Sequence, residues 1–319
     1  MNDMLKKLPK RLKQSLARLS LPVVRACLRY TPLRPVRRAF WSHVVLPRYW
    51  WRRFDFVAST RFGAKVIGNT GEVIQKYICY FGIWEPNLTA WIKERLKPGD
   101  VFIDVGANIG YFSLLASRLV GKEGHVVAIE ASPPVFELLR RNLHRNRAQN
   151  VRAVNVAVSD REGEVQLYAG PDNDCGRTTA AQTLADQYNL RPSAKVQALP
   201  LVAILHDEEI RRARLIKIDV EGYEWHVLSG MEAMLESCRP DIEIMVELSP
   251  PALESEGRTT RDFFGILNSL GFHAYTITND YAAESHFLSE DMARPVKLRE
   301  TALSAQVDLI FSRLDAASI

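Results

Sequence analysis

Cysteine is scarce in this 319-residue chain, and the four cysteines are not grouped. Cys27, Cys79, Cys175 and Cys238 lie far apart and form no Cys-x-x-Cys pair. That spacing excludes a cysteine-based zinc site and a disulfide scaffold. A reducing compartment, the cytoplasm, is therefore expected.

Long apolar runs are also missing. No segment approaches the ~18 consecutive apolar residues of a transmembrane helix. Near the N-terminus, Arg18, Arg25 and Arg29 interrupt the apolar stretches, and no apolar core followed by a small-residue cleavage site is present. We therefore expect neither a signal peptide nor a membrane span in this part of the chain.

Acidic residues are nearly absent from the first part of the chain. Residues 1–53 contain 14 Lys plus Arg and a single acid, Asp3, which gives a net charge of +13. The rest contains 28 basic and 36 acidic residues, a net charge of −8. Proteins that grip nucleic acid present a basic surface, so this acidic body makes nucleic acid an unexpected partner.

The basic arm, residues 1–53, also carries apolar residues. Leucines recur at helical spacing: Leu5, Leu8, Leu12, Leu16 and Leu19. Aromatic residues follow: Phe40, Trp41, Trp50, Trp51 and, just beyond the arm, Phe54. This composition is typical of a helix on an anionic membrane surface, which predicts peripheral contact at the inner face of the membrane. It equally fits an amphipathic segment packed on the body or on a partner. Four prolines predict short helices instead of one long helix: Pro9, Pro22, Pro32 and Pro35.

The segment Val101–Gly110 is the most informative part of the chain. Its sequence, Val-Phe-Ile-Asp-Val-Gly-Ala-Asn-Ile-Gly, predicts a buried strand and a glycine turn, with a helix beginning at Tyr111. A strand, a glycine turn and a helix N-terminus together form a nucleotide pocket. The residues that we expect to bind the methionine side of a cofactor there are Asp104, Gly106, Asn108 and Gly110.

The spacing of this turn indicates which nucleotide binds. A dinucleotide turn uses Gly-x-Gly-x-x-Gly around a pyrophosphate, but Asn108 stands where the second glycine would be. The carboxylate of Asp104 favours a ligand without phosphates that carries ammonium or sulfonium charge, and S-adenosylmethionine carries both. Glu130 ends the next strand, about 20 residues past the turn, where a ribose hydroxyl needs an acceptor. Weaker candidates, for the adenine edge, are Ala157 and Asp160.

Carboxylates also end two later strands. Leu215-Ile-Lys-Ile-Asp-Val-Glu-Gly-Tyr-Glu224 predicts a strand followed by three acids, and Asp241–Pro250 contains another strand with a terminal carboxylate. Ligands of open α/β sheets bind beyond the C-terminal ends of the strands. Five carboxylates fall at or just past such ends: Asp104, Glu130, Asp219, Glu221 and Glu247.

These two regions, together with Gly82-Ile-Trp-Glu-Pro86 upstream, resemble the FkbM-type methyltransferase family from about Phe54 to Phe311. The resemblance implies an α/β, Rossmann-like class I methyltransferase fold. Its seven-stranded sheet would be mostly parallel, with an antiparallel last strand. It also implies S-adenosylmethionine as the methyl donor. The acceptor would be a hydroxyl of a small molecule or glycan, on a saccharide, a glycolipid or a secondary metabolite.

The position of each carboxylate along these strand ends indicates its function. We expect Asp219 and Glu221 to face the methyl group and the acceptor, with Glu221 as the base and His226 as an alternative. Lys217 lies on a central strand and needs an anionic partner, which we expect to be Glu247. Carboxylates such as these suit Mg²⁺, but nothing in the sequence singles out a metal, and none is expected.

The chain is expected to have three parts: the arm at 1–53, a hairpin and helix at 54–98, and the methyltransferase domain at 99–319. Strands are expected at 101–105, 125–130, 151–158, 163–168, 214–219, 241–247, 272–278 and 305–313. Helices are expected at 87–96, 111–120, 134–146, 223–236 and 259–270. Weak periodicity between Ala169 and Ser193 predicts a functional loop that acts as a lid.

Three other functions are open to the sequence. An N-methyltransferase on nucleic acid or protein typically carries Asp/Asn-Pro-Pro-aromatic after the fourth strand, where this chain has Asp219-Val-Glu221-Gly222. A nicotinamide-dependent dehydrogenase lacks support from the turn and from any Tyr-x-x-x-Lys pair. A non-catalytic scaffold that binds cofactor or membrane remains the third alternative.

Overall fold

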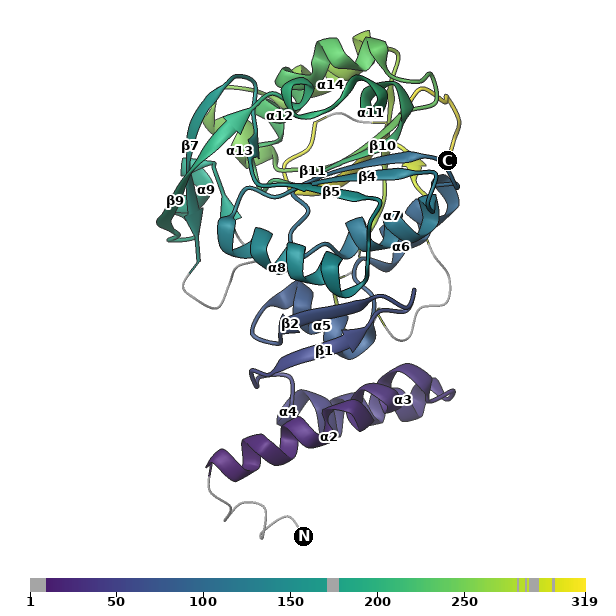
Figure 1. The fold of residues 1–319 in the computed structure, drawn as a ribbon, viewed down its shortest axis with the longest axis vertical. Helices are drawn as coiled ribbons and strands as arrows, with labels where there is room; N and C mark the ends of the chain where they lie inside the picture. The colour runs from purple at the N-terminus through teal and green to yellow at the C-terminus, as the bar shows by residue number, and fades with distance from the viewer. Residues whose placement is uncertain (1–9, 171–177, 280, 285, 287–292, 300–301) are drawn as a thin grey trace. The chain divides into compact units, whose positions relative to one another are not determined.

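The computed structural model describes residues 10–170, 178–279, 281–284, 286, 293–299 and 302–319. The chain forms two compact units. The first comprises Met1–Trp84 and Tyr281–Glu290, and the second comprises Glu85–Asp280 and Asp291–Ile319. Figure 1 traces both from purple at the N-terminus to yellow at the C-terminus.

The second unit is built on an eight-stranded sheet. In order across the sheet, the strands are β13 (Val296–Lys297), β12 (His273–Thr276), β14 (Val307–Ser312), β11 (Glu243–Leu248), β10 (Ala213–Ile218), β3 (Val101–Val105), β4 (His125–Ile129) and β5 (Val151–Val154). Strand β14 runs antiparallel to both of its neighbours, as expected for the last strand. The two-residue edge strand β13 makes eight strands where seven were expected.

Helices cover both faces of this sheet (Figure 1). They are α6 (Pro86–Arg95), α7 (Tyr111–Val120), α8 (Pro133–Arg145), α10 (Leu201–Ile204), α11 (Asp207–Arg212), α12 (Glu224–Met231), the 3-10 helix η2 (Glu232–Ser237), α13 (Pro250–Ser255) and α14 (Thr260–Ser269). Helices α6, α7 and α8 lie on one face, and α11, α12 and α14 lie on the other. Because both faces are covered, strand β3 is buried along its whole length.

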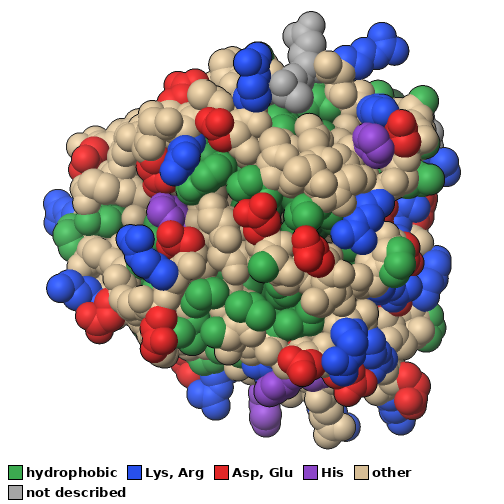
Figure 2. Space-filling view, turned by 90° about the horizontal axis from the view of Figure 1, so that it is seen from above, with side chains coloured by type: hydrophobic (Ala, Val, Ile, Leu, Met, Phe, Trp, Pro, Cys, Tyr) green, Lys and Arg blue, Asp and Glu red, His purple; other side chains and the backbone are tan. Residues whose placement is uncertain are grey.

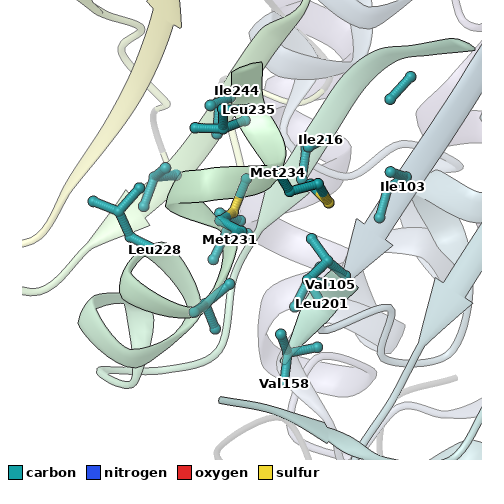
Figure 3. Close-up of a cluster of buried hydrophobic side chains, with 14 of the residues drawn as sticks. Ile103, Val105, Val158, Leu201, Ile216, Leu228, Met231, Met234, Leu235 and Ile244 are labelled. Carbon is teal, nitrogen blue, oxygen red and sulfur yellow. The ribbon is translucent and has the colours of Figure 1, made fainter. Parts of the chain in front are cut away.

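The main hydrophobic core lies between the sheet and α12 with η2. Figure 3 shows Ile103, Ile216 and Ile244, from three adjacent strands, in one buried cluster with Met231 and Leu235. All five side chains are buried. Packing of this kind fixes the register of β3, β10 and β11 and thereby the level at which each strand ends.

The outer surface above α12 and α14 carries mixed charge. Figure 2 shows acidic and basic side chains interspersed with apolar ones on this face. Among the described residues visible there, the basic side chains form no continuous track.

A second, four-stranded sheet lies beside the main one, in the order β6-β9-β7-β8. Its strands are β6 (Ala157–Val158), β9 (Arg191–Leu199), β7 (Gly163–Ala169) and β8 (Thr178–Thr179). The prediction of a single strand at 151–158 is wrong. Residues 155–156 separate β5 from β6, and β6 joins this second sheet. The loop expected between Ala169 and Ser193 is also wrong over its described residues. They include β8, helix α9 (Gln182–Gln187) and the start of β9.

The first unit contains a helical part and a small β-hairpin with a helix. Its elements are α2 (Lys10–Tyr30), α3 (Arg34–Phe40), the π-helix η1 (Trp41–Val45), α4 (Leu46–Arg48), β1 (Asp55–Ser59), β2 (Lys65–Asn69) and α5 (Val73–Phe81). The hairpin was expected from the glycines between the strands, and α5 was not. Among the described residues, no helix combines the length and apolar character needed to cross a membrane.

Helix α2 contradicts the expectation that the prolines divide the arm into short helices. It continues through Pro22 over 21 residues. Leu21, Val24 and Leu28 on one of its faces are buried, and α2 lies against α5. The guanidinium of Arg29 donates hydrogen bonds to the carbonyl oxygens of Ile78, Cys79 and Tyr80 at 2.7–3.0 Å. This packing offsets the single backbone hydrogen bond that a proline removes.

Candidate functional site

Polar side chains form a row on one face of the main sheet. Residues of β3, β10, β11 and β14 that alternate with the core positions point to the opposite face. On that face lie Asp104, Lys217, Glu247 and Asp308, all buried except the partly exposed Glu247. These four titratable groups form one row near the C-terminal ends of the parallel strands, and they define the candidate site.

The turn after β3 holds the row close to the neighbouring strand end. Gly106 has φ of +80°, and a Cβ built on it would lie 1.8 Å from the carbonyl oxygen of Asp219. Gly110 has φ of +88°, and a Cβ there would lie 2.6 Å from the side chain of Leu139. Only glycine combines these backbone angles with so little space.

Asp104 has an oxygen with no partner. Its Oδ2 accepts a hydrogen bond from Ser113 Oγ at 2.5 Å, and its buried Oδ1 has no hydrogen-bond partner among the described residues. Burial raises the pKa of Asp104, and the charge of Lys217 and the bond from Ser113 act in the opposite direction. An enclosed carboxylate oxygen beside a glycine turn fits a positively charged ligand.

Glu130 bridges the glycine turn and the end of β4. Its Oε2 accepts from the backbone N–H of Asn108 at 2.9 Å, and its Oε1 accepts from the N–H of Ser132 at 2.8 Å. Burial raises the pKa of Glu130 to about 7, against the effect of these two bonds. A carboxylate has roughly four lone-pair sites, so two remain for ribose hydroxyls. The sequence interpretation did not assign Asn155, whose Nδ2 donates to the carbonyl oxygen of Glu130 at 2.7 Å.

Lys217 pairs with Asp219 and not with Glu247. Its Nζ lies 2.7 Å from Asp219 Oδ2 and 5.2 Å from the centroid of the Phe112 ring. Burial alone would lower the pKa of Lys217, but Asp219, Asp104 and Glu85 outweigh it and the pKa is raised. The expected partner was wrong because Lys217 stands opposite Met245 in the register, which leaves Glu247 two positions further along.

Glu247 is coupled to Asp219 and Asp308. Burial, and next the charge of Asp219, hold the pKa of Glu247 well above its usual range. A hydrogen bond joins the side chains of Glu247 and Asp219, and it also raises the pKa of Glu247. Despite its burial, Asp219 has a lowered pKa, first because of Lys217 and then because of this bond. Asp308 lies directly opposite Glu247, and burial raises its pKa to about 6.

Asp308 was not predicted from the sequence. Its Oδ2 accepts from Asn279 Nδ2 at 2.7 Å, while its buried Oδ1 has no hydrogen-bond partner among the described residues. The only available signal was an acid within an otherwise apolar strand, Val-Asp-Leu-Ile-Phe. That pattern is insufficient by itself, because acids on exposed strand faces are common.

Glu221 lies in a turn that other elements hold in place. It has φ of +54°, and its carbonyl oxygen accepts a hydrogen bond from Thr179 Oγ1 at 2.5 Å. The next residue, Gly222, is covered by α9, since a Cβ on it would lie 2.3 Å from Leu184. The described part of the segment expected to be a lid therefore packs against the turn that carries Glu221.

The three acids after β10 and β11 are close enough to share one cation. An oxygen of each of Asp219, Glu221 and Glu247 lies within 4.8 Å of the other two. Carboxylate oxygens at such spacing can hold Mg²⁺ or Ca²⁺. The same oxygens are equally able to contact an acceptor, as the sequence interpretation has it.

The other predicted residues lie in a different group. His226 stacks on Tyr223 at 4.1 Å, and its ring nitrogens lie 3.4 Å from Asp160 and 3.2 Å from Glu256. Ala157 is buried in β6 and pairs with Ala198 of β9. The structure thus brings together Asp104, Lys217, Asp219, Glu221 and Glu247, with Glu130 at the adjoining turn. It places His226 and Asp160 beside one another instead.

The strand order, the antiparallel β14 and the glycine turn after β3 define a class I, S-adenosylmethionine-dependent methyltransferase fold. The model of the methyltransferase FkbM domain matches residues 104–274. The chain belongs to this family.

Three curated relatives are similar to parts of the chain. The 31-O-demethyl-FK506 methyltransferase FkbM of Streptomyces tacrolimicus is 32% identical over 43% of this chain and 62% of its own length. The hexuronic acid methyltransferase AglP of Haloferax volcanii is 25% identical over 48% and 59%. The methyltransferase sdnD of Sordaria araneosa is 28% identical over 43% and 62%. The chain thus spans about three fifths of the length of these relatives.

Among solved structures, the chain is similar to an S-adenosylmethionine-dependent O-methyltransferase from Thermotoga maritima. The TM-score is 0.39 at 14% identity, covering 82% of this chain and 78% of that chain. A likeness this weak says nothing about the site.

Proposed function

We propose that this protein transfers a methyl group from S-adenosylmethionine to a hydroxyl group of a saccharide, glycolipid or secondary metabolite. The observation that carries the proposal is the group of three acids after β10 and β11. Asp219, Glu221 and Glu247 lie at these strand ends, next to the glycine turn that follows Asp104. Family membership supports the donor. The names of two relatives, for a hexuronic acid and for a 31-O position, support the oxygen acceptor.

The turn residues fit the methyl donor. The buried Oδ1 of Asp104, which has no hydrogen-bond partner in the described part of the chain, suits a cationic group. Glu130 retains acceptor sites for ribose hydroxyls. Positive φ angles at Gly106, Asn108 and Gly110 form a tight turn, and a ligand can approach its backbone closely at the two glycines. We assign Asp104, Gly106, Asn108, Gly110 and Glu130 to cofactor binding; Ala157 and Asp160 have no such support from their contacts.

S-adenosylmethionine supplies a methyl group on a sulfonium centre, which is already activated. In the transfer the S–CH₃ bond breaks, an O–CH₃ bond forms, and S-adenosylhomocysteine leaves. The protein must hold the acceptor oxygen in line and accept its proton. We assign Glu221 as the base. Asp219 is paired with Lys217 and its pKa is lowered, which makes its carboxylate a weak base, whereas burial and the charge of Asp219 raise the pKa of Glu247 and favour its protonated form.

The test is binding and turnover measured separately. Titration calorimetry with S-adenosylmethionine should give binding for the wild-type chain and none for Asp104→Asn. Glu221→Gln should bind the donor with unchanged affinity but transfer no labelled methyl to a panel of hydroxylated acceptors. Glu137→Gln, an exposed substitution on α8, is the control. A wild-type chain that ignores the donor and binds a nicotinamide dinucleotide would end the proposal.

We also propose that residues 1–53 bring the protein to a membrane at its inner, cytoplasmic face. The support is the excess of basic residues in this segment and the exposure of apolar side chains on its helices. An acceptor linked to a lipid would then be concentrated at the same surface.

A further inference from the structure

Helix α2 has a second apolar face that no described residue of the first unit covers. Its buried face, Leu21, Val24 and Leu28, packs within the unit. On its other face, exposed residues recur at intervals of four, three and four, as helical spacing requires. They are Leu19 (76% exposed), Val23 (64%), Ala26 and Tyr30 (78%).

The neighbouring helix α3 extends this surface. None of its seven residues is buried. Leu33, just before it, is 62% exposed, and Val36 within it is 49% exposed. A short helix with no buried side chain gains little stability from packing within the protein. Its apolar side chains are therefore available for contact with another molecule or a lipid surface.

The charge around these apolar residues is of one sign. Between residues 10 and 53 the sequence has twelve Lys or Arg and no Asp or Glu. Exposed arginines next to the apolar residues include Arg18, Arg34 and Arg38. A second copy of the same surface would be repelled by this charge, whereas an anionic surface would be attracted.

We propose that Leu19, Val23, Ala26, Tyr30, Leu33 and Val36 form a lipid-docking surface that inserts into the interface of a bilayer containing anionic phospholipids. This inference rests on the proposed membrane contact of residues 1–53, and it specifies the residues and the lipid class. The apolar side chains enter the boundary between headgroups and acyl chains, and the arginines contact lipid phosphates. A nucleic acid would satisfy the arginines but would leave the apolar stripe in water.

Arg29 attaches α2 to α5 and is not part of the lipid-docking surface. Its guanidinium is occupied by the carbonyl oxygens at the end of α5, and burial, with the charge of Arg25, lowers its pKa to about 10. Arg29 therefore holds α2 in place and does not contact lipid. Substitutions on the exposed stripe leave this attachment intact.

The experiment is co-sedimentation of the full-length protein with vesicles. The vesicles are phosphatidylcholine alone, or phosphatidylcholine mixed with phosphatidylglycerol. Wild-type protein should bind the mixed vesicles at least about tenfold more tightly than the neutral ones, with binding weakened by salt. Leu19→Glu/Val23→Glu should reduce binding to the mixed vesicles by at least about tenfold, since each substitution removes an apolar side chain.

Val202→Glu/Leu314→Glu is the matched control. Val202 (50%) and Leu314 (57%) are exposed apolar residues of the second unit, so this double variant introduces the same two negative charges outside the proposed surface and should bind as wild type. Thermal melting checks that the Leu19→Glu/Val23→Glu variant is folded. Its affinity for S-adenosylmethionine should be unchanged, so a loss of vesicle binding is distinct from a failure of the methyltransferase proposal.

Four results would overturn the inference. The first is equal binding of the wild type to neutral and mixed vesicles. The second is vesicle binding that survives Leu19→Glu/Val23→Glu. The third is a double variant that loses a concentration-dependent dimer seen by light scattering in the wild type, which would assign the stripe to a second copy. The fourth is binding of duplex DNA that competes with the vesicles and is equally tight for the wild type and the double variant, which would assign the arginines to nucleic acid.

Discussion

The carbonyl oxygen of Asp219 lies so close to Gly106 that a Cβ added to the glycine would be 1.8 Å away from it. The glycine turn after β3 and the end of β10 are therefore in backbone contact. No side chain can be inserted between them without moving one of the two. In the function that we propose, this one contact would position both the methyl donor and the acceptor.

This contact predicts the effect of Gly106→Ala. The variant should lose at least about 2 kcal/mol of unfolding free energy, from the left-handed backbone angle and the clash together. It should also lose donor binding. Urea denaturation and calorimetry measure the two effects.

Two glycines serve as controls for Gly106→Ala. Gly99 has φ of +90° with nothing within 4 Å, so Gly99→Ala reports the backbone strain without a clash. Gly163 has open space and no positive φ, so Gly163→Ala should be nearly neutral. If Gly106→Ala destabilises no more than Gly99→Ala does, the turn can move and the close contact is not a constraint.

The sequence was sufficient to predict the parallel strands β3, β4, β10 and β11 and the acids at their ends. Runs such as Val101–Val105 are apolar and are closed by glycines, so their bounds and burial were predictable. The partner of Lys217 was not predictable, because it depends on the register between β10 and β11, which sequence periodicity does not specify. Asp308 was missed for a similar reason, since only pairing with Glu247 reveals its place.

Local sequence signals also failed where tertiary packing decides the structure. Pro22 predicted a break, yet burial of Leu21, Val24 and Leu28 keeps α2 continuous. The segment with α9 has weak periodicity because only two of the helix's six residues, Leu184 and Ala185, are buried. Both elements are stabilised by contacts with distant parts of the chain, which a local window does not contain.

Glu224 should make stability depend on pH. Its side chain is buried and accepts a hydrogen bond from the N–H of Gly222, and burial raises its pKa to about 7. The folded state therefore binds this proton more tightly than the unfolded state. Its contribution to stability is complete below the ordinary value of 4.5 and is lost as the pH rises to about 7.

Glu224→Gln removes this titration and keeps an acceptor for Gly222. The unfolding free energy of the variant, relative to wild type, should rise by about 2 kcal/mol between pH 5.5 and pH 8. Urea denaturation at both pH values measures the difference. Parallel pH profiles for the two proteins would show that Glu224 does not stay protonated in the fold.

Lys217→Met should destabilise the protein strongly. It leaves Asp219 and Asp104 without the cation that offsets their charge in a buried row. Breaking a buried ion pair from one side typically costs about 3–5 kcal/mol. Lys195→Met, on the exposed side of β9, should change the unfolding free energy by less than about 0.5 kcal/mol. Equal stability of the two variants would mean that water, and not Lys217, offsets the charges of Asp104 and Asp219.

Thr179→Val tests whether β8 holds the proposed base in place. The hydroxyl of Thr179 donates to the carbonyl oxygen of Glu221 and accepts from the N–H of Ala181. Valine keeps the shape but leaves both groups without this partner, at a cost of about 1–3 kcal/mol in stability. Because Glu221 is released and Asp104 is untouched, kcat should fall at least about tenfold while the affinity for S-adenosylmethionine stays the same. Thr179→Ser, which retains the hydroxyl, should restore kcat. A Thr179→Val enzyme with wild-type kcat would show that the turn keeps Glu221 in place without β8.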